Sequence, residues 1–341
     1  MSIWNPLNHL LERIRNCGGF VNSHAHFDRA YSVNVNDFLS DSGVTLSKQQ
    51  KFSGVHSHLF EKWELVDQYK KDSSECDYEN HIRLALEDQR KQGVKTCLSF
   101  IDCDPVCEMR AIHAANKLQK EFSQKYGMHF LLANQTLKGV IDPEARKWFE
   151  ESLDFVDIIG GLPGKDKGKE SEHLDILFQA AKETNKRVHV HVDQLNSPLE
   201  KETELLISKI EKHQLHGKVT AVHGISIAAH HKKYRHELYK KCKDVGLSFI
   251  ACPSAWIDSR RNETLTPTHN AVTPLDEMSE HGIIVALGTD NICDIYKPFC
   301  NGDMTTELRI LLESTHFYDM DILTKIATTN GLHVLGIEKN V

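Results

Sequence analysis

The sequence predicts an α/β protein folded as a (β/α)8 TIM barrel, and three observations lead to this prediction. Eight short runs rich in Val, Ile, Leu and Phe are typical of strands buried on both faces of a parallel sheet. From the second run onward they recur roughly every 30 residues, which is the length of one βα unit. The segments between them have the apolar spacing of helices. The predicted strands are residues 19–24, 94–101, 128–134, 155–161, 187–192, 218–224, 247–252 and 283–288.

Three predicted helices illustrate the segments between these strands. The helix over 173–186 carries apolar residues three or four positions apart. The helix over 198–213 places Pro198 in its first turn, and the helix over 234–246 ends at Gly246. Eight strands alternating with helices predict a closed barrel. An open doubly wound sheet is the alternative, but the sequence has neither a GxGxxG nor a Walker loop to support it.

The interval between the first and second strands is longer than the others. It spans about 70 residues, more than twice one βα unit. The surplus, residues 31–80, contains a helix-like segment over 55–71. Because it follows the carboxyl end of a strand, we expect it over the catalytic face, either as a lid or as a passive insertion. We treat residues 1–341 as a single barrel domain with this insertion.

Composition limits the class of partner. The 341 residues carry a net charge of -7, with lysines and acids mixed along the chain, so no basic face favours nucleic acid. The sequence contains no run of about 18 apolar residues, so we expect no membrane span. The nine cysteines form no CxxC pair, which favours reduced thiols in the cytoplasm. We therefore expect a small-molecule substrate, and a homo-oligomer is compatible with the sequence.

The segment SHAHFD, at the end of the first predicted strand, contains His24 and His26. Residues two apart on a strand point to the same face, so both imidazoles can reach one metal ion. An HxH pair alone is weak evidence, because a histidine-rich chain produces such pairs by chance. His56 and His58 form a pair of this kind.

Position strengthens the interpretation. His191 ends the fifth predicted strand, His223 ends the sixth, and Asp290 follows the eighth. In an α/β barrel these carboxyl ends meet at one mouth, where functional side chains gather. Imidazole and carboxylate are suitable ligands for Zn²⁺ or Fe²⁺. His189 shares a strand face with His191 but lies one layer deeper, and we interpret it as a packed histidine or one that supports a ligand.

The order HxH, His, His, Asp on strands one, five, six and eight resembles that of the amidohydrolase superfamily. The segments ANQTLKG, FVDIIGGLPGK, HVHVDQLN, KVTAVHGIS, LSFIACPSAWIDSR and ALGTDNICDIYKPF look like successive segments of its cytosine-deaminase branch. The similarity covers about residues 19–335. It implies a barrel enzyme that hydrolyses C–N bonds with one divalent metal.

The resemblance also implies residue roles. Asp290 would bind the metal and take a proton from the attacking water, and His223 would hydrogen-bond that water or polarise the substrate. Gln135 falls where the family places an amide that reads a pyrimidine ring edge. Asn291 is expected at the substrate as well. The implied metal ligands are His24, His26, His191 and Asp290.

The sequence departs from the family at the position three residues after His191. Cytosine deaminase has a proton-shuttling Glu there, whereas this chain has Gln194, which can hydrogen-bond but cannot carry a proton at neutral pH. The neighbouring Asp193 would point the other way on a regular strand. Either another acid serves, or the substrate needs no shuttle. Hydrolysis of an amide or cyclic amide is such a case, because Asp290 can move the proton to the leaving nitrogen.

Three further departures bear on the site and fold. Arg29 stands where triazine-type relatives have Lys, and it either binds an anionic or carbonyl group of the substrate or forms a salt bridge at the barrel mouth. Lys165 lies beyond the fourth strand, which argues against a carboxylated lysine bridging two metals. Only about 20 residues precede the first strand and the chain stops soon after NGLHVLGIEKNV, so we expect no terminal β-sandwich.

These observations favour a mononuclear hydrolase that cleaves a C–N bond of a small nitrogen heterocycle or related compound. Gln194 stays among the candidate catalytic residues. One alternative is an aminopyrimidine deaminase with an altered proton shuttle. The other, from a different class, is a non-catalytic metal-binding or interaction protein, which Gln194 in place of the acid suggests.

Overall fold

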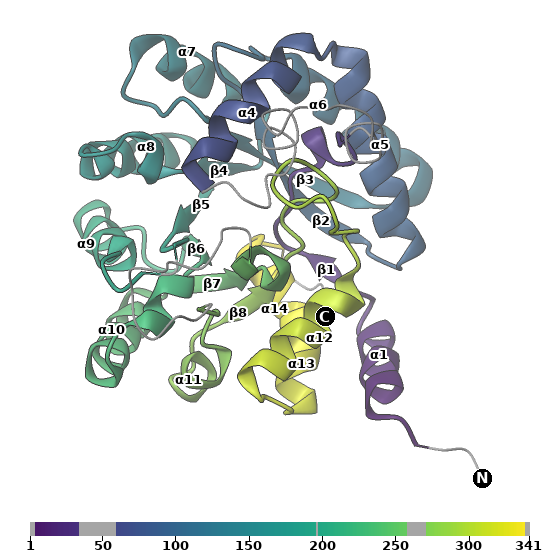
Figure 1. The fold of residues 1–341 in the computed structure, drawn as a ribbon, viewed down its shortest axis with the longest axis vertical. Helices are drawn as coiled ribbons and strands as arrows, with labels where there is room; N and C mark the ends of the chain where they lie inside the picture. The colour runs from purple at the N-terminus through teal and green to yellow at the C-terminus, as the bar shows by residue number, and fades with distance from the viewer. Residues whose placement is uncertain (1–3, 34–58, 196, 258–270, 338–341) are drawn as a thin grey trace, which may run out of the picture.

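The strands of the computed structural model form a parallel barrel ringed by helices (Figure 1). The structure describes residues 4–33, 59–195, 197–257 and 271–337. Its strands pair in chain order in one eight-stranded sheet, as the sequence predicts. The strands are β1 (Val21–Asn22), β2 (Thr96–Asp102), β3 (His129–Gln135), β4 (Ile158–Gly161), β5 (Arg187–Val192), β6 (Val219–His223), β7 (Ser248–Ala251) and β8 (Val285–Leu287).

Hydrogen bonds join the end of β8 and the residues after it to the segment that follows β1, and they close the barrel. The Ser23 N–H donates to the Leu287 carbonyl at 2.9 Å, and the Thr289 N–H donates to the His24 carbonyl at 3.0 Å. A parallel bridge pairs Ala25 with Asp290. The open-sheet alternative is therefore wrong, and the same contacts hold the HxH segment beside Asp290.

Helices cover the outside of the sheet, as Figure 1 shows. Short 3-10 helices follow several strands, including η1 (Phe27–Arg29), η3 (Pro163–Lys165), η4 (Ile225–Ala229) and η5 (Pro253–Ile257). The α-helices are α1 (Pro6–Asn16), α4 (Leu59–Asp72), α5 (Glu75–Lys91), α6 (Arg110–Tyr126), α7 (Pro143–Ser152), α8 (Glu170–Thr184), α9 (Glu202–His213), α10 (Lys232–Val245), α11 (Leu275–Glu280), α12 (Met304–Thr315), α13 (Met320–Ala327) and α14 (Thr329–Val334).

The start of α9 differs from the prediction. The helix begins at Glu202, so Pro198 lies before it rather than in its first turn. The cause is Asp193, whose carboxylate accepts the N–H groups of Glu202 at 2.9 Å and Thr203 at 3.2 Å. A side-chain oxygen on the first free N–H groups fixes where a helix starts. Here the capping residue comes from the end of β5, nine residues upstream.

The core has an inner and an outer part, separated by the strands. Along β2, Leu98 and Phe100 belong to a cluster made mostly of strand residues, whereas Cys97 and Ile101 belong to the larger cluster that includes the helices. This alternation follows from the two-residue period of a strand. The barrel interior is therefore a packed core, and Phe100 reaches its upper layer beside the His24 ring, 4.7 Å between centroids.

The predicted insertion covers residues 31–80, of which residues 34–58 lie outside the described residues. The described part of the insertion includes α4. Tyr69 donates to the Asp28 carbonyl at 2.7 Å, and the Lys70 ammonium pairs with Asp102, the last residue of β2, at 3.4 Å. These contacts place α4 against the carboxyl ends of β1 and β2. Among the described residues, no helix is long and apolar enough to cross a membrane.

Candidate metal centre

Four histidines and one aspartate lie together at the mouth of the barrel, all of them buried. The His24 ring centroid is 5.0 Å from that of His26, 4.8 Å from that of His191 and 5.9 Å from that of His223. Asp290 Oδ1 lies 3.0 Å from His26 Nε2 and 3.4 Å from His24 Nε2. The residues come from β5, β6 and the segments after β1 and β8. The fold therefore brings together side chains from four segments that lie far apart in the sequence.

The donor atoms of these residues are close enough to share one ion. One atom each from His24, His26 and His191 lie within 4.8 Å of one another, and the same holds for His24, His223 and Asp290. Both ring nitrogens of His24, and Nδ1 of His26, have no hydrogen-bond partner among the described residues. A buried polar atom without a partner is costly, and a bound cation would remove that cost. The donor set therefore fits a divalent metal.

The histidines are held in the neutral form that a metal requires. Burial lowers the pKa of His24, and it lowers the pKa values of His26 and His191 much further. Burial also lowers the pKa of His223 to about 3. His191 Nδ1 lies 3.1 Å from the Gly161 carbonyl, which leaves Nε2 for a ligand role. Neutral, oriented imidazoles of this kind suit Zn²⁺ or Fe²⁺.

Backbone geometry at the mouth is unusual. His223 and Asp290 have φ values of 77° and 59°. These values lie in the left-handed region of backbone conformation, which residues other than glycine rarely adopt. Such conformations persist where the surroundings enforce them, often at functional sites. Gly288 allows a close approach nearby, because a Cβ there would lie 2.8 Å from the His24 carbonyl oxygen and 2.9 Å from His24 Cβ. Its substitution would displace the first ligand segment.

Asp290 has a basic partner that sequence reasoning missed. The Lys297 ammonium donates to Asp290 Oδ2 at 2.7 Å, and both side chains are buried. Burial alone would raise the pKa of Asp290, but Lys297 and the histidines hold that pKa well below its usual value. Lys297 lies seven residues beyond Asp290 in a segment of clear family resemblance, yet no spacing rule identifies it. Only the loop that follows β8 brings it back to the carboxylate.

Arg29 lies beside the metal centre in what we call the ion-pair cluster. The cluster comprises Asp28, Arg29, Lys70, Asp102, Asp104 and Asp294. The Arg29 guanidinium lies 3.2 Å from Asp294, 3.4 Å from Asp102 and 3.7 Å from Asp28. Arg29 therefore forms salt bridges at the barrel mouth, and its contact with a substrate stays a prediction. Burial and the Asp102 charge raise the pKa of Asp28 to about 7.

Asn291 bridges the two groups of residues. Its Oδ1 accepts from Arg29 Nε at 3.1 Å, and its Nδ2 donates to Asp290 Oδ1 at 3.2 Å. Both ends of the amide are thus engaged within the protein. The expected substrate contact of Asn291 remains a prediction, because a substrate would have to share or replace these bonds.

The remaining candidate residues differ in their surroundings. Gln135, at the end of β3, is buried, and its Oε1 has no hydrogen-bond partner among the described residues, which suits a substrate contact. Gln194 is half-buried just after β5. Asp193 is committed to capping α9 and also accepts the Thr203 hydroxyl at 2.5 Å. It therefore does not replace the missing glutamate.

Two residues near the ligands lie outside the candidate donor groups. His189 lies one layer deeper, where its Nε2 is 3.0 Å from the Val334 carbonyl and burial lowers its pKa to about 3. Lys165 is the last residue of η3, beyond the end of β4. His189 and Lys165 thus lie where the sequence analysis placed them, one layer below His191 and beyond the fourth strand, and their roles stay predictions.

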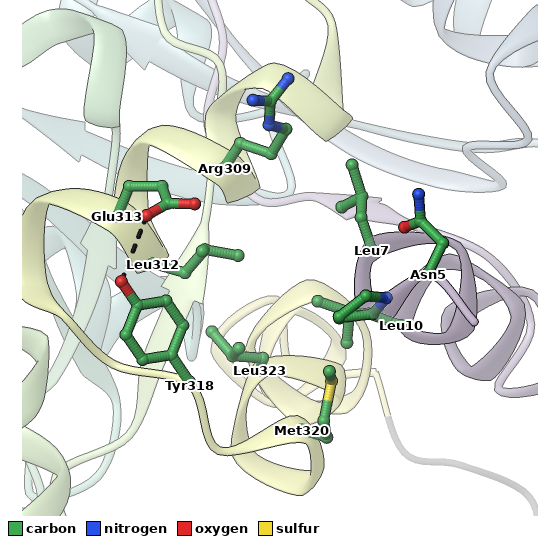
Figure 2. A pocket seen from close by; sticks show the side chains of 10 residues that line it. Asn5, Leu7, Leu10, Arg309, Leu312, Glu313, Tyr318, Met320 and Leu323 are labelled. Carbon is green, nitrogen blue, oxygen red and sulfur yellow. Dashed lines mark hydrogen bonds between the residues drawn. The ribbon is translucent and has the colours of Figure 1, made fainter. Parts of the chain in front are cut away.

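A separate pocket of about 490 Å³ lies on the outside of the barrel, between α1, α12 and α13 (Figure 2). Leu7, Leu10 and Leu323 give it an apolar lining. At its edge Tyr318 donates to Glu313 at 3.2 Å. None of the candidate site residues lines this pocket, so the chemistry of the metal centre does not involve it.

Comparison with known proteins bears on the class of enzyme. The model of the amidohydrolase family matches residues 17–341. The chain belongs to the amidohydrolase family. Its members are metal-dependent, and its deaminase and amidohydrolase relatives act on carbon–nitrogen bonds of small molecules. This amidohydrolase is accordingly a hydrolase of carbon–nitrogen bonds, as the sequence predicted.

Individual relatives span most of the chain. An uncharacterized protein of Haemophilus influenzae is 46% identical over 265 residues, covering 76% of this chain and 90% of that protein. The N-isopropylammelide isopropyl amidohydrolase of a Pseudomonas species is 25% identical over 94% of this chain and 75% of its own. The 5-methylcytosine deaminase of Klebsiella pneumoniae, liganded with 5-fluorocytosine, superposes with a TM-score of 0.82 at 21% identity, over 94% of this chain and 75% of that one. This last likeness establishes the barrel fold.

Proposed function

We propose that this amidohydrolase cleaves a C–N bond of a small nitrogen heterocycle, by deamination or by amide hydrolysis, with one Zn²⁺ or Fe²⁺ ion. The observation that carries the proposal is the convergence of buried, neutral imidazoles and one carboxylate, in which both ring nitrogens of His24 and Nδ1 of His26 have no hydrogen-bond partner among the described residues. The proposed ligands are His24, His26, His191 and Asp290. Relatives that act on N-isopropylammelide and on pterin support a ring substrate.

The ion would supply Lewis acidity, activating a water molecule and polarising the bond to be cleaved. Asp290 accepts the proton of the attacking water and delivers it to the leaving nitrogen. His223 stays neutral, because burial lowers its pKa to about 3, and it acts as a hydrogen-bonding group rather than as an acid. Gln135 presents an amide oxygen that has no hydrogen-bond partner among the described residues and can accept a ring N–H.

The direct test combines metal analysis with a substrate screen. The screen covers purines, pyrimidines, triazines, hydantoins and lactams, with ammonia and ring opening as the measured products. We expect about one metal per chain, as in mononuclear sites with a single open position, and turnover of at least one compound class. Full metal loading without turnover in any class would favour the alternative of a non-catalytic metal-binding protein.

The aminopyrimidine deaminase alternative depends on Gln194. Asp193, the acid next to Gln194, is occupied in capping α9 and is therefore a poor replacement for the shuttle. We therefore favour substrates in which Asp290 alone moves the proton. If Gln194→Glu creates ammonia release from aminopyrimidines while the parent protein has none, Gln194 is a specificity determinant. Ammonia release by the parent protein would instead establish the alternative.

Two further properties belong to this proposal. All nine cysteines are free thiols, and five of them are buried, which supports work in the reducing cytoplasm. The expected partner is a small-molecule substrate rather than a nucleic acid or a membrane. A cell-fractionation experiment with the tagged full chain tests the location directly.

A further inference from the structure

The outer pocket between α1, α12 and α13 is apolar, and none of the candidate site residues lines it (Figure 2). Its volume is about 490 Å³, and its lining includes Leu7, Leu10, Leu312 and Leu323. On one side it is bounded by α1, which packs against α13. A contiguous apolar hollow on the surface of a folded chain indicates a site of interaction.

Two aromatic side chains at this pocket are exposed. Tyr318 lines the pocket and is 54% exposed, and Trp4, which immediately precedes the lining residues Asn5 and Pro6, is 70% exposed. They are two of the six large hydrophobic side chains that are exposed among the described residues. Single exposed apolar residues are ordinary, but Trp and Tyr beside an apolar hollow are typical of a protein–protein interface. The two side chains therefore favour a protein partner.

Two opposite charges also line the pocket. Arg309 and Glu313 are one turn apart on α12. Among the described residues, Arg309 has no hydrogen-bond or ion-pair partner, and Glu313 accepts only the Tyr318 hydroxyl, at 3.2 Å. A cation that precedes an anion by four residues is the less favourable order for a pair along one helix. Figure 2 shows the two charged side chains apart, so both are available to a partner.

The order of these charges indicates that the partner is a second copy of this chain. A two-fold axis perpendicular to α12 sets the α12 helices of two copies antiparallel, and Arg309 of each copy then faces Glu313 of the other. One symmetric contact therefore pairs all four charges. A small amphiphilic anion would match Arg309 but would leave Glu313 without a counter-charge.

The same symmetry supplies an occupant for the pocket. A residue beside one pocket and close to a two-fold axis lies near the pocket of the other copy, which places Trp4 opposite that pocket. Pockets of a few hundred Å³ hold drug-sized ligands, and an indole side chain is smaller than these. A buried Trp contributes about 150–250 Å² of contact, and Trp is enriched among the residues that dominate binding energy.

We propose that this protein forms a two-fold symmetric dimer through α1, α12 and α13. In this dimer, Trp4 of each copy fills the pocket of the other, and Arg309 pairs with Glu313 across the axis. The interface is independent of the proposed reaction, because none of the proposed metal ligands lies in it. Variants that break the dimer should therefore keep their metal.

Sedimentation velocity of the full chain over a range of protein concentrations measures the mass of the species in solution. We expect a monomer at low concentration and a dimer at high concentration. Trp4→Ser should raise the dissociation constant by roughly thirtyfold or more, the effect of removing an interface hot spot. Leu199→Ser, at an apolar residue that is 84% exposed and does not line this pocket, is the matched control and should leave the constant unchanged.

Charge reversal tests the symmetry of the contact. Arg309→Glu and Glu313→Arg each place like charges across the axis, so each should weaken the dimer. The double variant restores opposite charges in both contacts and should recover most of the affinity. Circular dichroism and metal analysis check that every variant is folded.

A chain that stays monomeric at every concentration would overturn the inference. Saturable binding of anilinonaphthalene sulfonate to that monomer would assign the pocket to a small amphiphile instead. A dimer of unchanged affinity in Trp4→Ser and in both charge variants would place the interface elsewhere on the molecule. A double variant that dimerises no more tightly than the single ones would refute the symmetric pairing.

Discussion

Two groups of buried polar residues share one rim of the barrel, and they are built in opposite ways. In the ion-pair cluster, Arg29 has three carboxylates within 3.7 Å, and Lys70 lies between Asp102 and Asp104. In the metal centre, both ring nitrogens of His24 lack any hydrogen-bond partner among the described residues. Burial is equally deep in both, so it does not explain the difference.

The contrast distinguishes buried polar residues that stabilise the fold from buried polar residues that are available to bind a ligand. A buried charge that is fully paired contributes to one arrangement of the chain, and breaking the pair destabilises the fold. A buried imidazole without a hydrogen-bond partner destabilises the fold, because its polar nitrogens have lost their contact with water. Binding of a ligand to those nitrogens would explain why such a residue is present. Asn291 connects the two groups, from Arg29 to Asp290. The ion-pair cluster thus positions the metal centre without being part of its chemistry.

The largest expected effect is loss of the metal. His26→Ala and His191→Ala each remove one of the proposed ligands, so metal content should fall from about one per chain to a small fraction, with turnover lost as well. Metal analysis of the purified variants gives the answer. His189→Asn, one layer deeper, is the matched control and should keep its metal. If both ligand variants kept the ion, the metal centre would not bind it as proposed, and the metal centre would no longer differ in function from the ion-pair cluster.

Asp290→Asn should come next in size. The amide preserves the shape of the side chain but cannot accept a proton, so turnover should fall by roughly 10²–10⁴-fold, the usual contribution of a general base. The rate on whichever substrate the screen identifies is the readout, with circular dichroism to check the fold. An unchanged rate would mean that the carboxylate is structural, like those of the ion-pair cluster.

Arg29→Met tests the other side of the comparison. It leaves Asp294 buried without its Arg29 partner and Asp102 with Lys70 alone, which should lower the free energy of unfolding by about 3–5 kcal/mol. Denaturant unfolding measures this change. Arg83→Met breaks a more exposed pair with Glu121 and should cost about 1 kcal/mol or less. A small effect at Arg29 combined with altered substrate affinity would return this residue to the substrate site.

The smallest expected effect concerns pH and Glu307. Burial raises its pKa to about 7 from the ordinary value of 4.5, so the folded protein holds a proton that the unfolded chain releases between these values. The contribution of Glu307 to the free energy of unfolding should therefore fall as pH rises from about 4.5 to 7, by at most about 3 kcal/mol. Glu307→Gln should flatten that slope in metal-free protein, and Glu313→Gln, elsewhere on α12, should not. An identical slope in all three proteins would contradict the shift.

The strands and the proposed ligands were accessible to sequence reasoning because their signals are local. The predicted strands are short continuous runs, such as residues 187–192. The HxH motif gives the spacing of two proposed ligands, and its position at the end of a strand places both of them at the barrel mouth. The start of α9 was not accessible, because the Asp193 cap acts from a different element. The surroundings of Arg29 were also hidden, since its partner Asn291 lies 262 residues away in the sequence. Contacts formed by barrel closure leave no periodic pattern to detect.

The most direct test is anomalous diffraction from crystals of the metal-loaded protein. The account predicts a single peak at the barrel mouth, about 2.0–2.2 Å from nitrogens of His24, His26 and His191 and from an oxygen of Asp290. Two neighbouring peaks bridged by Lys165, or one peak away from these four side chains, would contradict it.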